Sequence, residues 1–178
     1  MNSSIKIEAS LQPEVELKIS DANNNIEKQI DDIERFISNK VDVIIVSPIQ
    51  SKPLTAVVEK SIKAGIPVLV VDRKIDGEKY TAYLGADNIE IGRIAGRYII
   101  SHSKGSGKII EITGAIGSSP AYERSLGFGQ IIKENKHIKI ENTIHGDWEG
   151  ESVKEPLKEP LKAILILNTF FLITIAWL

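Results

Sequence analysis

The dipeptide Asp72-Arg73 follows directly on Pro67–Val71, a run with the composition of a buried strand. A carboxylate accepts hydrogen bonds from two hydroxyl groups, and a guanidinium offers a rigid fork of donors. The pair therefore suits the adjacent hydroxyls of a sugar, or a ring oxygen beside one hydroxyl. A local ion pair or helix cap after the strand is the alternative interpretation of the same two residues.

The glycine-rich segment Gly114–Pro120 lies between another predicted strand and a helix. It lacks the Lys-Ser/Thr ending of a P-loop and the three-glycine spacing of a dinucleotide site, so the pattern disfavours nucleotide binding. Pro120 at the helix start, with Ser118 or Ser119 as its cap, explains the segment structurally. Arg124 lies one turn into that helix, where it can reach a ligand at the strand ends or form a surface salt bridge.

Other kinds of site find little support in the residue types. The three histidines, at positions 102, 137 and 145, have no ligand spacing, and the chain has no cysteine. We therefore predict no metal site, no disulfide and no cofactor. No Ser-His-Asp, Cys-His or hydrolase-type carboxylate pattern is recognisable, so we predict no catalytic residue. Trp148 follows a predicted strand and can stack on a sugar face or pack against the sheet.

The composition is that of an ordinary globular protein. Of the 178 residues, 42% are hydrophobic and 26% charged, with a formal net charge of −2. This is enough for one domain with a sizeable core, and the near-neutral charge disfavours a nucleic-acid partner. The N-terminal residues lack a basic stretch followed by an apolar one, so we expect no signal peptide and a cytoplasmic location for the chain as written.

Strands and helices alternate along the chain. The predicted strands are Val15–Ile19, Val41–Val46, Pro67–Val71, Tyr80–Leu84, Lys108–Thr113 and Ile138–Thr143, and the predicted helices include Ile26–Ile37, Leu54–Ile62, Ile89–Ile100, Ala121–Lys133 and Gly150–Leu161. The alternation predicts an α/β fold with open parallel sheets. Ligands of such sheets bind at the carboxyl ends of strands, which points to Ser47, Asp72-Arg73 and the loops after Leu84 and Thr113. The polar break Ser101–Gly107 is the predicted crossing between two lobes.

Several strings resemble ribose-type periplasmic binding proteins in their order and spacing. They are Asp72-Arg73, Gly85-Ala86-Asp87-Asn88 and Ser118-Ser119-Pro120-Ala121-Tyr122-Glu123-Arg124, and the resemblance runs from Glu8 to Leu161. The strings at 21–25, 45–48, 53–55, 72–74 and 80–88 further resemble the periplasmic sensor region of bacterial hybrid two-component histidine kinases. This resemblance implies a fold of two Rossmann-like lobes, a small-molecule sugar ligand and a periplasmic parent protein, and it leaves a homodimer open.

The resemblance also implies a set of sugar contacts. Asp72, Arg73 and Arg124 match the family's positions directly. Ser47 and Ala86 match more weakly, because the transport proteins hold Asn and Ser there. Asp72 and Arg73 would come from the first lobe and Arg124 from the second, so the ligand would bridge a hinged cleft. Closure of that cleft on the ligand would then be the signal.

The chain departs from the family at both ends. Met1 falls inside the first helix, so the predicted first lobe (residues 1–103) lacks its first strand, and residues 104–162 form only the start of the second lobe. Residues 163–178 are almost wholly apolar, where the family has His-Pro-Asp, a strand and an Asn-Asp pair. A frameshift near Lys162 explains this tail, because permitted codons read from one base earlier encode the family's pattern. A membrane span is the alternative, and the only way in which a membrane would be a partner.

We therefore expect a non-enzymatic sugar-sensing domain of a two-component system, truncated and weak or inactive in binding. One alternative is the solute-binding protein of a sugar ABC importer. Another is the effector domain of a LacI-type repressor, which would need a helix-turn-helix upstream, and none precedes Met1. A small α/β enzyme acting on sugars is the alternative of a different class, and sustained turnover would distinguish it from a binding module.

Overall fold

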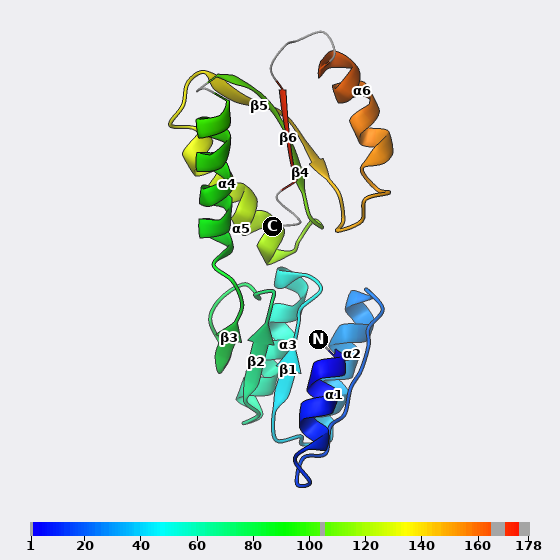
Figure 1. The fold of residues 1–178 in the computed structure, drawn as a ribbon. Coiled ribbons are helices and arrows are strands. Elements are labelled where there is room, and N and C mark those ends of the chain that lie inside the picture. The colour runs from blue at the N-terminus through cyan, green and yellow to red at the C-terminus, as the bar shows by residue number, and fades with distance from the viewer. Residues whose placement is uncertain (1, 104–105, 165–169, 175–178) are drawn as a thin grey trace.

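The computed structural model describes residues 2–103, 106–164 and 170–174 of the chain. Figure 1 shows two lobes stacked end to end, the first holding α1 to β3 and the second α4 to β6. The elements of the first lobe are α1 (Asn2–Ser10), α2 (Ile26–Ser38), β1 (Ile44–Val46), α3 (Ser51–Lys63), β2 (Val68–Val71) and β3 (Ala82–Leu84). Those of the second are α4 (Asn88–His102), β4 (Gly107–Thr113), α5 (Ser119–Ile132), β5 (Ile138–His145), α6 (Lys154–Ile164) and β6 (Phe170–Thr174). The predicted α/β fold is confirmed.

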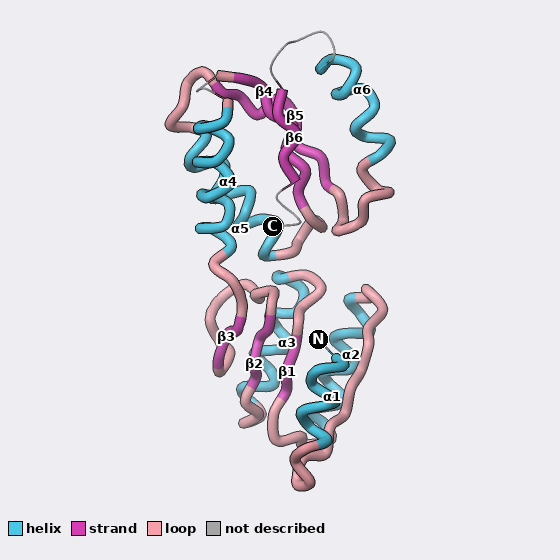
Figure 2. Tube along the Cα trace, viewed as in Figure 1, coloured by secondary structure: helices cyan, strands magenta, loops and turns pink. Residues whose placement is uncertain are grey.

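The sheet of the first lobe is parallel, in the order β1-β2-β3 (Figure 2). Ile44 aligns with Val68, and Val70 aligns with Tyr83, so β1, β2 and β3 end at one edge. The side chains of Ile44, Val46, Val68 and Val70 point to one face, where they pack in a single core with residues of α2 and α3. The isoleucine stripe of α2 predicted this packing, because residues spaced by three and four share one helix face.

The opposite face of this sheet is open, which corrects two expectations. Val41–Val46 was expected to be buried on both faces, but Ile45 is 48% exposed and Val43 is 46% exposed. Val15–Ile19 was expected to be a strand, but it has no regular secondary structure. The two differences have one cause. Within the described residues, β1 is the edge strand of its sheet. No strand therefore lies beyond β1 to pair with residues 15–19, and no helix next to such a strand covers the open face.

The second lobe has its own parallel sheet, in the order β5-β4-β6. One face packs against α4 and α5 through Ile109, Phe128 and Ile132, and the other packs against α6 through Ile110 and Leu157. Helices therefore cover both faces of β4, and this strand matches the pattern of a parallel strand buried on both sides.

Helix α4 lies with the second lobe rather than the first. Its residues Ala95 and Ile99 share a core with Ile109 and Phe128. A Cβ atom added at Gly92 would lie 2.0 Å from the carbonyl oxygen of Arg124, so the missing side chain permits the close approach of α4 to α5. The chain thus crosses between the lobes at 85–87, before α4, and not at Ser101–Gly107 as expected.

The apolar tail falls only partly within the described residues. Phe170–Thr174 forms β6, which pairs in parallel with β4, while 165–169 and 175–178 lie outside the description. In the part of the chain that the structure describes, none of the helices is long and apolar enough to cross a membrane. The frameshift hypothesis is untested by these observations and stays a prediction about the gene.

Candidate functional site

Asp72 stands at the carboxyl end of β2 in an unusual backbone conformation. Its φ is 66°, in the left-handed region that aspartate tolerates better than most residues. Its backbone N–H donates to the carbonyl of Leu84, the last residue of β3, over 2.8 Å. The side chain is left 66% exposed at the end of the sheet that faces the second lobe.

Arg73 connects the first lobe with the second. Its Nη1 donates to the backbone carbonyl of Ile49 over 3.2 Å, and its Nε lies 3.8 Å from Asp72 Oδ2. The guanidinium carbon lies 5.8 Å from the centre of the Trp148 ring, which follows β5 in the second lobe. This cation–π contact places a charged fork and an aromatic ring together between the lobes.

Arg124 approaches from the second lobe. Its Nε donates to Asn88 Oδ1 over 2.8 Å, and Asn88 is 2% exposed at the first residue of α4. Burial lowers the pKa of the Arg124 guanidinium, and the carboxylate of Asp72 acts in the opposite direction. Asp72 belongs to the first lobe and Arg124 to the second, and contact of both with one ligand stays a prediction.

Ser47 and Ala86 are placed less directly. Ser47 follows β1 and is half-buried, and its backbone carbonyl accepts a hydrogen bond from Gln29. Ala86 lies exposed on the segment that crosses between the lobes, and its carbonyl accepts from Asn88 Nδ2 over 3.4 Å. Neither contact involves a side chain of Ser47 or Ala86, and the role of these two positions in ligand binding stays a prediction.

Two residues near the site were missed or left aside in the sequence analysis. Asn88 belongs to the string Gly85–Asn88 that carried part of the resemblance, and its buried amide holds Arg124. Trp148 has two interpretations from sequence. Its Nε1 is buried without a hydrogen-bond partner among the described residues, and its ring lies between Gly114 of its own lobe and Arg73 of the first lobe. The sequence signal for Trp148 was its position just after a strand.

The two lobes contact each other around these residues. Lys74 Nζ lies 2.7 Å from Glu123 Oε1, and the backbone N–H of Lys74 donates to Ser119 Oγ over 2.6 Å. The N–H of Ser51 donates to the carbonyl of Gly117 over 3.0 Å. The hydrogen bond with Glu123 raises the pKa of Lys74, although burial opposes it. The loop after β2 and the start of α3 in the first lobe thus contact the loop after β4 and the first turns of α5 in the second lobe.

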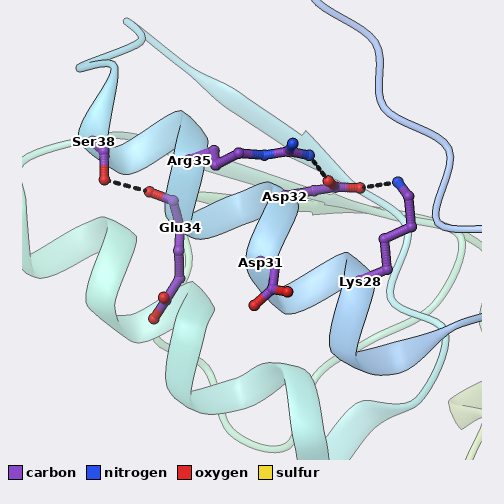
Figure 3. Close-up of a pocket in the computed structure, with 6 residues that line it drawn as sticks. All are labelled: Lys28, Asp31, Asp32, Glu34, Arg35 and Ser38. Carbon is purple, nitrogen blue, oxygen red and sulfur yellow. Dashed lines mark hydrogen bonds and ion pairs between the residues drawn. The ribbon is translucent and has the colours of Figure 1, made fainter.

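A charged hollow on the outer surface of α2 lies away from these residues (Figure 3). Its centre is Asp32, whose side chain is 6% exposed and pairs with Lys28 Nζ at 2.7 Å and with Arg35. Asp32 also accepts from Ser20 Oγ, so it ties the segment before α2 to the helix. Both carboxylate oxygens of Asp32 have partners within the chain, and we therefore assign this hollow a structural role.

The site offers chemistry for binding polar groups rather than a metal. Across the described ranges, no group of three or more His, Cys, Asp or Glu residues is placed to hold a metal ion. A carboxylate, two guanidinium groups and an indole ring converge instead, the first two from β2 and the others from α5 and the end of β5. Such a set hydrogen-bonds hydroxyl groups and covers an apolar ring face.

Comparison with known proteins places this arrangement in a family. A family model described as "Periplasmic binding protein domain" matches residues 4–165. The galactofuranose-binding protein YtfQ of Escherichia coli (strain K12) is 31% identical over 153 residues, which cover 84% of this chain and 48% of that protein. The ribose import binding protein RbsB of Bacillus subtilis (strain 168) is 29% identical, over 78% of this chain and 46% of that protein.

Solved structures agree in fold. The fructose binding periplasmic domain of hybrid two component system BT1754 superposes with a TM-score of 0.88 at 38% identity, over 96% of this chain and 57% of that one. A periplasmic component of the arabinose ABC transporter from Shewanella sp. ANA-3 gives a TM-score of 0.86 at 28% identity, over 97% of this chain and 58% of that one.

The chain spans about half the length of these relatives. The match nevertheless runs through both lobes and includes Asp72, Arg73 and Arg124. The resemblance expected from the sequence is confirmed: the chain belongs to the periplasmic binding protein family.

Proposed function

We propose that the cleft between the two lobes binds a small sugar. The observation that supports this proposal is the contact of Arg73 with Asp72 and with the Trp148 ring, with Arg124 on α5 of the facing lobe. The carboxylate would accept hydrogen bonds from adjacent hydroxyls, and the two guanidinium groups would donate to hydroxyl or ring oxygens. Trp148, with its indole N–H buried and unpartnered, would cover one face of the sugar ring.

The likeness to sugar-binding relatives supports the same ligand class. The names of those relatives specify galactofuranose, ribose, fructose and arabinofuranose, which are all small sugars. Ser47, at the end of β1, would offer its hydroxyl to the sugar, and Ala86, on the crossing segment, would leave space beside it. Binding requires no cofactor and no covalent step in this proposal.

The experiment is a titration with D-fructose, L-arabinose and D-ribose, followed by isothermal calorimetry and by Trp148 fluorescence. Replacing Trp177 by Phe leaves Trp148 as the chain's single tryptophan. We expect weak, saturable binding of at least one sugar. Asp72→Ala should abolish it, because the remaining guanidinium groups cannot accept hydrogen bonds. Sustained conversion of any of these sugars into product would instead indicate an enzyme.

We further propose that the chain belongs to a periplasmic sensor of a hybrid two-component system. The support is the 38% identity and TM-score of 0.88 to such a domain, over 96% of the chain. The importer alternative has support of its own, since curated relatives include ribose import proteins at 29% identity. In the sensor, closure of the lobes on sugar would be the signal passed to the rest of the protein.

The nucleotide sequence of the gene separates these proposals. A frame beginning one base earlier near codon 162 is expected to encode His-Pro-Asp, a strand and an Asn-Asp pair, followed by further coding sequence. A span and a kinase beyond that would support the sensor, and a stop after the binding domain would support the importer. If the shifted frame is closed, the apolar sequence of residues 163–178 is the natural one, and a membrane role for it is reopened.

A further inference from the structure

The side-chain amide of Gln29 makes two hydrogen bonds with the loop that follows β1, one through its nitrogen and one through its oxygen. Its Nε2 donates to the carbonyl of Ser47 over 2.9 Å, and its Oε1 accepts from the N–H of Ile49 over 2.9 Å. Pro48 lies between these groups, is fully buried and has no N–H to donate. The glutamine amide therefore pairs with the loop as a neighbouring strand would, at the point where β1 has ended.

The same loop holds Arg73. The carbonyl of Ile49 accepts from Arg73 Nη1 over 3.2 Å, so the peptide group next to the one that Gln29 fixes is the acceptor for the guanidinium. Arg73 in turn lies 5.8 Å from the centre of the Trp148 ring. A continuous set of contacts thus leads from the first turns of α2, through one loop, to the cation between the lobes.

The loop also contacts the second lobe. Ser51 donates its N–H to the carbonyl of Gly117, and Gln50 Nε2 donates to the carbonyl of Ile116 over 3.4 Å. A shift of the Ser47–Ser51 segment would therefore move Arg73 and loosen the interlobe contacts together. Core packing of α2 uses Ile26, Ile30, Ile33 and Ile37, and Gln29 is not part of that cluster.

We infer that Gln29 is a positioning residue for sugar binding, acting through the Ile49 peptide to hold Arg73 against the ligand. This inference rests on the proposed function of the cleft. It deepens that function by placing a determinant of affinity on α2, a helix that none of the other site residues belongs to. Gln29 itself does not contact the ligand.

The test is a double-mutant cycle between Gln29→Met and Arg73→Ala in the Trp177→Phe background. Methionine has the length and helix propensity of glutamine but makes no amide hydrogen bonds. We expect Gln29→Met alone to weaken D-fructose binding about tenfold, as the loss of two hydrogen bonds would. In the Arg73→Ala background the same change should alter affinity by less than about twofold, because its effect passes through Arg73.

A second readout needs no sugar. Removing the Arg73 cation changes the surroundings of the Trp148 ring, so Arg73→Ala shifts Trp148 emission. Gln29→Met should shift emission in the same direction, and the double variant should shift it no further than Arg73→Ala does. If none of the sugars binds the parent chain, the proposed function fails, while this emission cycle still decides whether Gln29 positions Arg73.

Two variants serve as controls. Asp31→Met changes an exposed residue of the same helix and should leave affinity and emission unchanged. Gln29→Ala removes both amide hydrogen bonds without adding a charge, so it provides the same cycle if Gln29→Met does not fold. Additive effects of Gln29 and Arg73 substitutions on both affinity and emission would overturn the inference, as would an unshifted Trp148 emission in both Gln29 variants.

Discussion

Strand β1 at the edge of the first sheet and strand β4 at the centre of the second have similar apolar sequences and very different surroundings. In the second lobe, Ile109 and Ile110 point to opposite faces of β4 and are 0% and 1% exposed. In the first lobe, Ile44 and Ile45 of β1 are 4% and 48% exposed. Helices cover both faces of β4, whereas α2 and α3 cover only one face of the first sheet. A run of β-branched residues therefore predicts a strand, but the burial of that strand depends on which helices pack against each face of the sheet.

The contacts between the lobes have a different character from the two sheets. Lys74, after β2, pairs with Glu123 and donates its N–H to Ser119, and both partners lie on α5. Apolar side chains are also exposed in this region, since Leu84 at the end of β3 is 58% exposed and Ile116 after β4 is 65% exposed. Polar contacts, rather than complete burial, therefore join the two lobes.

Among substitutions by alanine, the largest loss of stability should come from a buried position of the second lobe. Ile110→Ala removes a fully buried side chain and should lower the free energy of unfolding by about 3 kcal/mol. Ile45→Ala in the first lobe should lower it by less than about 1 kcal/mol, because little apolar surface is lost from water contact. Urea unfolding followed by circular dichroism measures both. Equal losses would mean that the face of β1 holding Ile45 is covered in solution.

A somewhat smaller loss of stability is expected from a substitution at the contact between α4 and α5. Gly92→Ala would place a Cβ atom 2.0 Å from the Arg124 carbonyl oxygen, which is backbone and cannot move aside alone. The helices must separate, at a cost of about 2 kcal/mol. Gly129→Ala on α5, where an added Cβ meets nothing within 4 Å, is the matched control and should leave stability unchanged or raise it. Thermal unfolding of the two variants should rank them in this order.

The open face of the first sheet should tolerate charge. Ile45→Lys introduces a cation at a half-exposed position and should change the free energy of unfolding by no more than about 1 kcal/mol. It should also reduce self-association, since exposed apolar surface on an edge strand favours aggregation. Light scattering at rising protein concentration measures the association. Ile44→Lys, one residue away and buried, should prevent folding and so confirms the contrast.

The smallest effect on stability should come from the interlobe pair Lys74–Glu123. Lys74→Met should weaken sugar binding severalfold by loosening the closed arrangement, with less than about 1 kcal/mol lost in stability. The pKa of Lys74 is raised in the folded chain, so the contribution of the pair is fully present below the ordinary value of 10.5 and is lost as pH rises through the higher folded value. Unfolding measured between pH 7 and 11 should show this loss in the parent chain and not in Glu123→Gln.

The sequence predicted the elements that have a regular apolar pattern. The stripes of α2 and α3 and the β-branched runs of β2 and β4 each formed as expected, because periodicity reports on local burial. Val15–Ile19 also alternates, but a strand requires a partner, and pairing is not encoded in the segment itself. The crossing between lobes was misplaced because Ser101–Gly107 has the composition of a linker, whereas the actual crossing at 85–87 is short.

The candidate site was predictable in part. The strand-end rule and the family resemblance selected Asp72, Arg73 and Arg124, and their role in ligand binding stays a prediction. The structure places Asp72 and Arg73 together after β2, and Arg124 on α5 with its hydrogen bond to Asn88. Asn88 and Gln29 were not selected, since they act through another side chain or through a peptide group. Such roles depend on tertiary contacts between residues far apart in the sequence, which no local pattern reports.

The most direct test of the proposed sugar site is a titration of the Trp177→Phe chain with D-fructose, L-arabinose and D-ribose, followed by Trp148 emission, alongside the same titration of Asp72→Ala. The account predicts a saturable change in Trp148 emission with at least one sugar in the first protein and none in the second. A parent chain that responds to none of the three sugars, or an Asp72→Ala variant that responds with unchanged affinity, would contradict it.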